Sequence, residues 1–311
     1  MCGSVCCNLS ETADGMTKSA HVLGGEGFIG SNLVARLRAG GHGVTMGIRP
    51  LAPNKPEDFA EIVASNDWVV HAASASTPSS SATDPLHELD DNLRTTLCLV
   101  QALQQAPHCG VIYLSSSGTL YGELLDREAT ELDPVRPRTY HGAGKVAAEH
   151  FLHSLCLQFG NPVVSVRPSN VYGPGQRSRP GFGIIPTAFE RCLDGQPLNL
   201  WGDGCNIRDY LYVDDLSDLL TRVICADPAK KYDVVNASSG SGHSLLQLVE
   251  AIRNVTRKEL DVSFQPARQL DARRIVPNSL HAAAKYGWRA TTPLHEGLER
   301  AWAWHKENAR P

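Results

Sequence analysis

Three glycines near the start of the chain have the spacing of a phosphate-binding turn. Gly24, Gly27 and Gly30 form the pattern G-x-x-G-x-x-G, between an apolar segment at residues 20–23 and a predicted helix at Ser31–Arg38. In a strand–turn–helix of this kind, Gly24 permits a tight turn, Gly27 lets the backbone approach a pyrophosphate, and Gly30 lets helix and strand pack closely. The N–H groups and dipole at the helix start favour an anion. The sequence therefore predicts a dinucleotide site, with a glycine-rich turn that binds no ligand as the alternative.

The elements that must hold these glycines are indicated by the alternation of apolar and amphipathic segments. Apolar runs predict further strands at Gly43–Ile48, Asp67–Ala73, Val111–Ser115 and Pro162–Val166. Amphipathic stretches predict helices at Glu57–Ala64, Leu86–Gln105, Gly142–Leu157, Pro186–Leu193, Asp214–Val223, Leu245–Arg253 and Leu294–His305. Strands that alternate with helices are typical of βαβ units, so we expect an α/β fold with a doubly wound parallel sheet.

The same pattern divides the chain into a larger first part and a smaller second part. We expect residues 1–17 to be a disordered tail and residues 18–168 to form the dinucleotide-binding domain. Long Gly- and Pro-rich stretches come after it, and these are typical of binding loops. Residues 169–311 are therefore expected to form mainly a smaller substrate-binding lobe, with residues near 205–240 returning to the first domain. We expect the ligands in the cleft between the two parts.

Composition and charge exclude several classes of partner. The 311 residues carry a net charge of −4, which offers no basic surface for a nucleic acid. No apolar run reaches the length of about 18 residues that a membrane span needs. The first 16 residues lack the basic and apolar regions of a secretory signal. The nine cysteines include no C-x-x-C pair, which favours reduced thiols in the cytoplasm and no metal site.

The choice between NAD and NADP depends on the end of the second predicted strand. An acidic residue at this position usually holds the adenosine ribose of NAD, but the chain has Ile48 and then Arg49. An arginine without the acid suits a 2′-phosphate, so Arg49 favours NADP, unless it is an ordinary surface arginine. Asp67 comes only 18 positions after Arg49, too few for a further strand and helix. The region that would hold adenine is therefore shortened, and the cofactor is NAD or NADP.

Seven segments in order resemble the extended short-chain dehydrogenase/reductases, in particular the nucleotide-sugar epimerase/dehydratase group. They are GGEGFIG at 24–30, DWVVHAAS at 67–74, SSSGTLYG at 115–122, HGAGKVAAEH at 141–150, RPSNVYGPG at 167–175, GDGCNIRDYLYVDD at 202–215 and KYGWRATTPLHEGL at 285–298. The resemblance implies a Rossmann-type domain with a substrate lobe, a nucleotide-diphosphate sugar as substrate, and a homodimer formed through a helix bundle. It also implies cofactor contacts from these motifs, at Phe28, Ile29, Ala72, Ala73, Ser115, Lys145 and Pro168.

The resemblance further implies a catalytic serine, a lysine, and a tyrosinate four residues before the lysine. Ser117 matches the serine and Lys145 matches the lysine. The chemistry explains these residue types. A tyrosine with a pKa near 10 must be lowered toward neutrality to act as a base, and a lysine ammonium and a nicotinium charge both favour the phenolate. Residues four apart on a helix share one face.

The base itself departs from the family pattern. His141 lies four residues before Lys145, and Tyr140 lies five before it. On an ideal helix, Tyr140 is rotated from Lys145 by about 140° and His141 by about 40°. Three alternatives stay open. His141 is the base, since an imidazole has an unperturbed pKa near 6.5. Tyr140 reaches the site through a distorted first turn. Or the base is lost and the protein binds cofactor without turnover.

On the substrate side, the resemblance maps Asn170, Arg208 and Arg268 onto groups that hold the nucleotide diphosphate. Arginines suit this role because their fork geometry matches phosphate oxygens. An ion pair with Asp209 is the alternative for Arg208. Arg273 and Arg274 are rivals of Arg268.

Three other polar residues receive structural interpretations. Asp214 and Asp215 are interpreted as caps at the start of a helix, where acidic residues are favoured. Asn92 either supports the backbone of the active site or belongs to a plain polar helix face.

The two residues after Ser117 narrow the reaction type. Related dehydratases have an acidic pair there, whereas this chain has Gly118 and Thr119, so dehydration is not expected. Epimerisation at C4 of the sugar, with bound cofactor, is the leading interpretation. NADPH-dependent reduction of a 4-keto sugar is second. A non-catalytic NAD(P)-binding regulator is the alternative of another class.

Overall fold

The computed structural model describes residues 17–47, 55–77, 84–123, 127–179, 183–226, 231–268 and 271–308. Ile48, Arg49 and the segment 1–16 lie outside these ranges, so the expectations for the tail and for the 2′-phosphate are not addressed by the structure. Within the described ranges, no helix has the length and apolar character that crossing a membrane requires.

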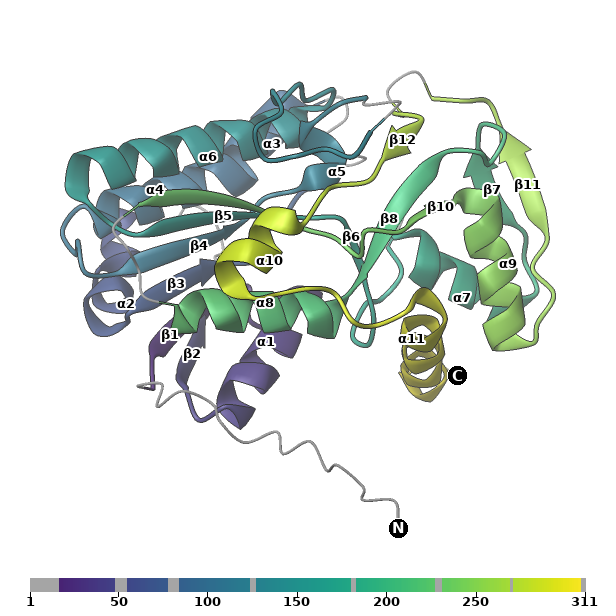
Figure 1. The fold of residues 1–311 in the computed structure, drawn as a ribbon, viewed down its shortest axis with the longest axis horizontal. Coiled ribbons are helices and arrows are strands. Elements are labelled where there is room, and N and C mark those ends of the chain that lie inside the picture. The colour runs from purple at the N-terminus through teal and green to yellow at the C-terminus, as the bar shows by residue number, and fades with distance from the viewer. Residues whose placement is uncertain are drawn as a thin grey trace, which may run out of the picture.

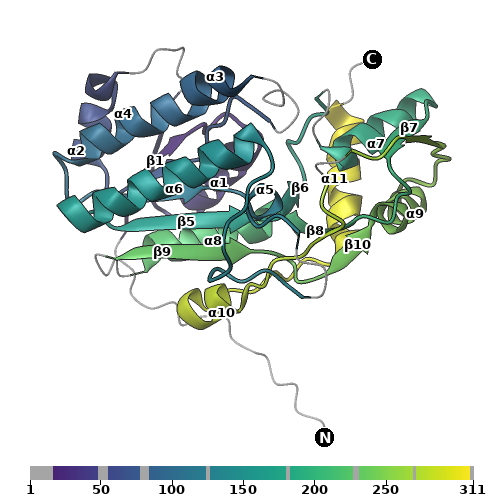
Figure 2. The same ribbon diagram turned by 90° about the horizontal axis from the view of Figure 1, so that it is seen from above.

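A six-stranded parallel sheet forms the centre of the larger part. Its order is β2-β1-β3-β4-β5-β9 (Figures 1 and 2). The strands are β1 (Ser19–Leu23), β2 (Gly43–Gly47), β3 (Trp68–His71), β4 (Gly110–Leu114), β5 (Val163–Pro168) and β9 (Tyr232–Ala237). After β1 the chain moves first to β2 on one side and then to β3 on the other. The order therefore reverses beside β1, where parallel sheets of this kind leave a ligand crevice.

Helices cover both faces of this sheet. The bounds of the helical elements in this part are α1 (Phe28–Ala39), η1 (Pro56–Phe59), α2 (Ala60–Ser65), α3 (Pro85–Glu88), η2 (Leu89–Leu93), α4 (Arg94–Leu103), α5 (Ser117–Leu120), α6 (Tyr140–Phe159), α8 (Val213–Cys225) and α10 (Leu280–Tyr286). One apolar core packs α1 and α8 against the sheet, and a second packs α2, α4 and α6 against the opposite face.

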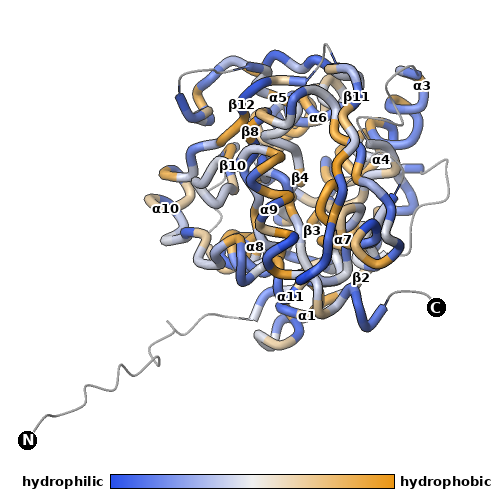
Figure 3. Tube along the Cα trace, turned by 90° about the vertical axis from the view of Figure 1, so that its right-hand side faces the viewer, coloured by the Kyte–Doolittle hydropathy of each residue, from blue (hydrophilic) through white to orange (hydrophobic). Residues whose placement is uncertain are grey.

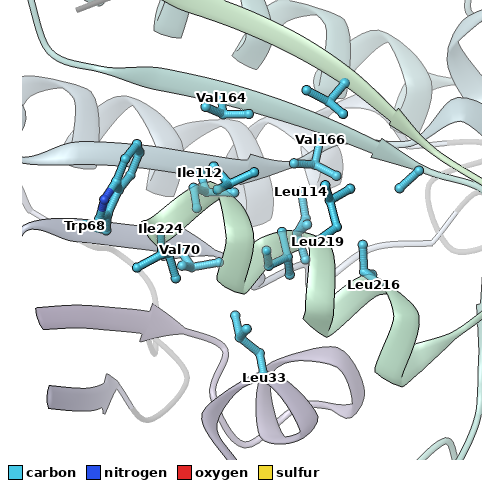
Figure 4. Packing of buried hydrophobic residues seen from close by; sticks show 14 of the residues in the cluster. Leu33, Trp68, Val70, Ile112, Leu114, Val164, Val166, Leu216, Leu219 and Ile224 are labelled. Atoms are coloured by element: carbon cyan, nitrogen blue, oxygen red, sulfur yellow. The ribbon is translucent and has the colours of Figure 1, made fainter. Parts of the chain in front are cut away.

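The strands are apolar along their length because both faces are buried. Val70, Ile112 and Val166 point toward α8, where Leu216 and Leu219 meet them (Figure 4). This double burial explains why the central strands read as continuous apolar runs rather than as alternating ones. It confirms the predicted α/β class with a doubly wound parallel sheet.

A smaller lobe is built on a third core. Its elements are β6 (Asn170–Tyr172), α7 (Ile184–Asp194), β7 (Leu198–Trp201), β8 (Ile207–Tyr212), β10 (Gly242–Ser244), α9 (Leu245–Thr256), β11 (Val262–Gln265), β12 (Arg274–Ile275) and α11 (Leu294–Asn308). β8 pairs with β6, β10 and β12, and β7 pairs with β11. Figure 3 views the molecule from this side, and α9 alternates between hydrophobic and hydrophilic colour because one side of it faces the core.

Several element bounds differ from the sequence prediction. The helix predicted at Leu86–Gln105 is interrupted, because the π-helical segment η2 separates α3 from α4. β5 continues to Pro168, two residues beyond its predicted end at Val166. The short strands of the smaller lobe were missed, since strands of two to six residues with mixed burial carry little periodicity.

Candidate active site

The glycine turn between β1 and α1 has the shape that the spacing predicts. Gly24 has a left-handed backbone with φ +80°, and a Cβ there would lie 2.8 Å from the backbone N of Ala73. A Cβ on Gly30 would lie 2.1 Å from the carbonyl oxygen of Gly24. Neither position can take a side chain without moving the backbone. Strand, turn and helix are therefore held in close contact by two residues without a Cβ.

The start of α1 suits a phosphate. Gly27 is the N-cap, it makes no side-chain cap, and the first turn carries no acidic residue. The first N–H groups of α1, beginning at Phe28 and Ile29, are therefore not covered by a capping side chain and can bind an anion. The turn fits the diphosphate of a dinucleotide, which supplies a nicotinamide ring for hydride transfer when it is bound.

The other predicted cofactor residues lie at or just after the carboxyl ends of neighbouring strands. Ala72 and Ala73 come after β3, Ser115 comes after β4, and Pro168 ends β5. The Ser115 hydroxyl is buried and has no hydrogen-bond partner in the described part of the chain. An unpartnered buried hydroxyl is costly unless a ligand satisfies it. Its position after β4 is compatible with the nicotinamide end of the cofactor.

The start of α6 separates the two candidate bases. Thr139 caps the helix by accepting a hydrogen bond from the backbone N of Gly142. Tyr140 is the first residue of the helix and is 47% exposed. His141 is 8% exposed and faces the interior. Tyr140 is not among the buried residues of the helix, so the structure does not turn its side chain inward.

Lys145 lies one turn after His141 on the same buried face. Its ammonium donates to the carbonyl oxygen of Leu114 at 2.8 Å and lies 4.8 Å from the centre of the Tyr113 ring. Burial lowers the pKa of Lys145 to about 8, and the charges of Glu88 and Glu149 oppose this shift. The lysine is therefore held at the end of β4, close to the strand edge where the cofactor is expected.

Ser117 belongs to the neighbouring helix α5. Its side chain is fully buried, and its hydroxyl donates to the carbonyl oxygen of Pro168 at 2.9 Å. The start of α6 packs against α5 so closely that a Cβ on Gly142 would lie 2.7 Å from the carbonyl oxygen of Thr119. The structure thus brings the elements that carry Ser117, His141 and Lys145 together.

A buried polar cluster lies beside His141. The Nδ1 atom of His141 is 3.0 Å from the Ser76 hydroxyl and 3.4 Å from Oε2 of Glu88. Asn92 accepts a hydrogen bond from the backbone N of Ala75 at 2.9 Å. It therefore supports the backbone, which is the first of the two interpretations drawn from the sequence. Ser76 and Glu88 were not predicted. Glu88 lies in a polar helical stretch and carries no sign of burial in the sequence.

A second buried charge pair anchors the far side of α6. Arg167 of β5 makes two hydrogen bonds to Glu149, at 3.0 and 2.6 Å, and a third to the Tyr121 hydroxyl at 2.9 Å. Tyr121 in turn donates to Asn236 of β9 at 2.6 Å. Because every member is paired, this network fixes α6 against the sheet.

The three predicted substrate residues lie on the side of the smaller lobe. Asn170 is exposed and donates to the carbonyl oxygen of Asp209 at 2.9 Å. Burial lowers the pKa of Arg208, whose guanidinium donates to the carbonyl oxygen of Ile207. The Arg268 guanidinium lies 3.7 Å above the Trp201 ring. Among the described residues, no hydrogen bond joins Arg268 to either of the other two.

The Asp209 carboxylate, next to Arg208 in the sequence, binds serine residues and not the arginine in the described part of the chain. Asp209 accepts hydrogen bonds from Ser169, Ser239 and Ser241, so the alternative of an Arg208–Asp209 ion pair is absent from the described contacts.

The capping interpretation was wrong for Asp215. Its carboxylate accepts from the backbone N of Thr291 and Thr292 at 3.2 and 3.0 Å, and so it ties the start of α8 to the segment before α11.

Comparison with known proteins decides the family. The model of the NAD dependent epimerase/dehydratase family matches residues 20–238. The chain belongs to this family. It is an enzyme with an NAD(P)-binding Rossmann domain, as the sequence predicts.

Individual family members resemble most of the chain. A UDP-glucose 4-epimerase of Mycolicibacterium smegmatis is 30% identical over 90% of this chain and 96% of its own length. A dTDP-4-dehydro-6-deoxyglucose reductase of Escherichia coli is 28% identical over 78% of this chain and 77% of its own length. The crystal structure of a Thermus thermophilus UDP-glucose 4-epimerase in complex with NAD aligns with a TM-score of 0.85 and 28% identity, over 94% of this chain and 100% of the other.

Proposed function

We propose that this protein interconverts the C4 epimers of a nucleotide-diphosphate sugar with NAD as its bound cofactor, and that His141 is the proton acceptor. The observation that carries the proposal is the pairing of His141 and Lys145 on one buried face of α6, beside α5 with Ser117, in a chain that matches 4-epimerases over nearly its full length. The absence of an acidic pair after Ser117, where Gly118 and Thr119 stand, argues against dehydration.

His141, Ser117 and Lys145 are proposed to have different roles in the proton transfer. Bound NAD supplies reversible hydride transfer at the sugar carbon. His141 takes the proton of the C4 hydroxyl, holds it while the sugar is a ketone, and returns it when the hydroxyl forms again. Ser117 shares a hydrogen bond with the same sugar oxygen. The Lys145 ammonium disfavours a positive charge on the imidazole and so keeps it competent to accept a proton.

Asn170, Arg208 and Arg268 are proposed to hold the diphosphate and the nucleoside of the substrate. A guanidinium such as Arg208, which is partly buried and has only a backbone carbonyl as its described partner, retains N–H donors for phosphate oxygens. Arg268 and Trp201 together present a flat cationic and aromatic surface at the edge of the smaller lobe.

Reduction of a 4-keto sugar is the second candidate. The similarity to a dTDP-4-dehydro-6-deoxyglucose reductase favours it, and that reaction uses the same proton donor and acceptor. It differs from epimerisation because the cofactor leaves oxidised after each turnover.

We also propose that the protein is a homodimer in the cytoplasm. Phe151 and Leu157 of α6 are apolar and are 47% and 74% exposed, which suits a helix that packs against a second copy. The six described cysteines are all free thiols, as expected in a reducing compartment.

Extraction of the cofactor and a turnover assay test the reaction. Purified protein is denatured, and the released nucleotide is identified by mass and absorbance. Retained NAD+ and conversion of UDP-glucose or UDP-N-acetylglucosamine to its C4 epimer are expected. Exchangeable NADPH, together with consumption of a 4-keto sugar and no epimer formation, would instead establish the reductase.

A further inference from the structure

The hydrogen bonds beside His141 assign a direction to every proton in the cluster. The backbone N of Ala75 can only donate, so the Asn92 atom that faces it at 2.9 Å is the carbonyl oxygen Oδ1. The amide nitrogen Nδ2 of Asn92 therefore points the other way. It donates to the Ser76 hydroxyl oxygen at 2.6 Å.

The Ser76 hydroxyl has a single proton and two places where it could go. The oxygen lies within hydrogen-bond distance of Oε2 of Glu88 and of Nδ1 of His141. Burial by itself raises the pKa of Glu88, but hydrogen bonds from His141 and Ser76 outweigh burial, so its pKa is lowered and the group is a carboxylate. A carboxylate only accepts, so Ser76 donates to Glu88. Its remaining contact, at 3.0 Å, then requires a proton on Nδ1 of His141.

This assignment leaves the lone pair of a neutral imidazole on Nε2. No residue in the described part of the chain makes a hydrogen bond to Nε2. The Nδ1 proton is directed at Ser76, with Oε2 of Glu88 slightly farther away at 3.4 Å. A carboxylate that holds Nδ1 in this way fixes the tautomer and stabilises the imidazolium that forms when Nε2 accepts a proton.

The Glu88 side chain occupies the space that a side chain at Gly144 would fill. A Cβ on Gly144 would lie 2.5 Å from Oε1 of Glu88 and 2.7 Å from its Cγ. The Glu88 side chain is 5% exposed, and Oε1 has no hydrogen-bond partner among the described residues. A buried carboxylate that packs on a helix backbone and leaves one oxygen unsatisfied is costly for stability. Packing alone does not account for it.

Few other charges face this histidine. From α6 the near charge is Lys145, and Glu149 farther along is neutralised by Arg167 of β5. From β4 the titratable neighbour of Lys145 is Tyr113, whose pKa is raised well above its usual value by burial, and from β3 it is His71, whose pKa burial lowers to about 3, so that its ring is neutral. On α3, η2 and α4, the other charged groups His87, Asp90, Asp91 and Arg94 form surface ion pairs. α5 carries no titratable side chain. The negative group next to His141 in the described structure is Glu88.

We propose that Glu88, supported by Ser76 and Asn92, is a positioning residue that holds His141 with its Nε2 lone pair free and compensates the charge that His141 gains during turnover. The inference rests on the proposed function, because it takes His141 as the proton acceptor. It adds three residues from the loop after β3 and from the α3–η2 segment to the working site. Because the Glu88 carboxylate packs against the backbone of α6, the proposal also explains why position 144 is a glycine.

A titration of the His141 ring by nitrogen NMR tests the proposal without relying on activity. Protein labelled at histidine is compared with Glu88→Gln, and the His141 signals are assigned by their loss in His141→Gln. We expect the wild type to carry its proton on Nδ1. In Glu88→Gln the tautomer with its proton on Nε2 should gain population, because the carboxylate that holds the Nδ1 proton is gone. A base must be deprotonated, and a nearby carboxylate favours the charged form of an imidazole, so the acid limb of the rate profile should move to lower pH.

Two further variants control the comparison. Gly144→Ala keeps Glu88 but displaces its carboxylate, so it should change the tautomer and the rate profile in the same direction. Asp90→Asn removes an exposed acid from the same helical stretch and should leave both profiles unchanged. An unchanged tautomer and an unchanged acid limb in Glu88→Gln, or a proton on Nε2 in the wild type, would overturn the proposal. A wild type that turns over no nucleotide sugar would contradict the proposed function alone, since the NMR titration still reports the contact.

Discussion

At the residue scale, Tyr140 and His141 are neighbours in sequence with different surroundings. Successive residues on a helix are rotated by about 100°, so two adjacent side chains cannot face the same site. His141 is buried against Ser76 and Glu88, whereas Tyr140 is 47% exposed and has no described hydrogen bond. An imidazole needs less adjustment than a phenol to accept a proton at neutral pH, because its unperturbed pKa is already near 6.5.

Replacement of the two candidate bases should therefore have opposite results. His141→Ala should lower the epimerisation rate by about 100-fold or more, the usual contribution of a general base. Tyr140→Phe should leave the rate within about twofold of wild type. Steady-state rates, with circular dichroism to confirm folding, provide the measurement. Full activity in His141→Ala with a large loss in Tyr140→Phe would transfer the role to Tyr140.

Lys145 should give the reaction a pH dependence. Burial lowers the pKa of this ammonium to about 8, so its positive charge is present below that pH and is lost as the pH rises through it. Because Lys145 is also proposed to bind the cofactor, the turnover rate should fall on the alkaline side as this charge is lost, with an apparent pKa near 8. Lys145→Arg should abolish this limb, because a guanidinium stays charged throughout the range. A profile in which wild type and Lys145→Arg share the same alkaline limb would exclude Lys145 as its cause.

At the element scale, the contact of α1 with the end of β1 depends on missing side chains. A Cβ on Gly30 would lie 2.1 Å from the carbonyl oxygen of Gly24, a distance that only a shift of the backbone can relieve. On the other face of the sheet, the irregular element is the π-helical segment η2. Segments of this kind are frequent at functional sites, and here it carries Asn92.

Gly30→Ala should therefore reduce both stability and cofactor binding. We expect a loss of about 1–3 kcal/mol in the free energy of unfolding, as for other overpacked interiors, and a weaker affinity for NAD. Gly43→Ala is the matched control, because a Cβ there meets no atom closer than 3.9 Å. Urea unfolding and fluorescence titration with NAD measure the two effects. Equal behaviour of the two variants would mean that close packing at Gly30 is not required.

At the scale of the whole molecule, the larger part carries the proton chemistry and the smaller lobe carries the residues proposed for the nucleotide. The segments that join them are β6, β8 and the chain before α11, which Asp215 ties to α8. The outer face of α6 remains open in the single chain, with the aromatic ring of Phe151 exposed.

Substitution on this face tests the proposed homodimer. Phe151→Asp should shift the protein from dimer to monomer, because a buried charge would have to be desolvated at the interface. Leu280→Asp, at a residue that is 60% exposed on α10, should leave the dimer intact. Sedimentation velocity distinguishes the two species. A wild-type protein that sediments as a monomer would contradict the proposal directly.

Local sequence rules determined much of this protein. The glycine turn and the alternation of strands and helices could be predicted because each depends on residues close together in the chain. Arg49 and the tail are not described by the structure and remain predictions. The interruption of the helix at Leu86–Gln105 could not be predicted, because a π-helical segment leaves the apolar periodicity almost unchanged.

The amino-acid sequence by itself predicted the family and left three alternatives for the base, namely His141, Tyr140 or none, since motifs impose residue types at fixed local spacing. Only the tertiary structure placed Glu88 and Ser76 against His141, across separations of 53 and 65 residues. Such contacts leave no periodic signal, because a buried carboxylate and a surface carboxylate look the same in one sequence. The fold decides which of them meets the histidine, since burial and hydrogen bonding depend on what packs nearby.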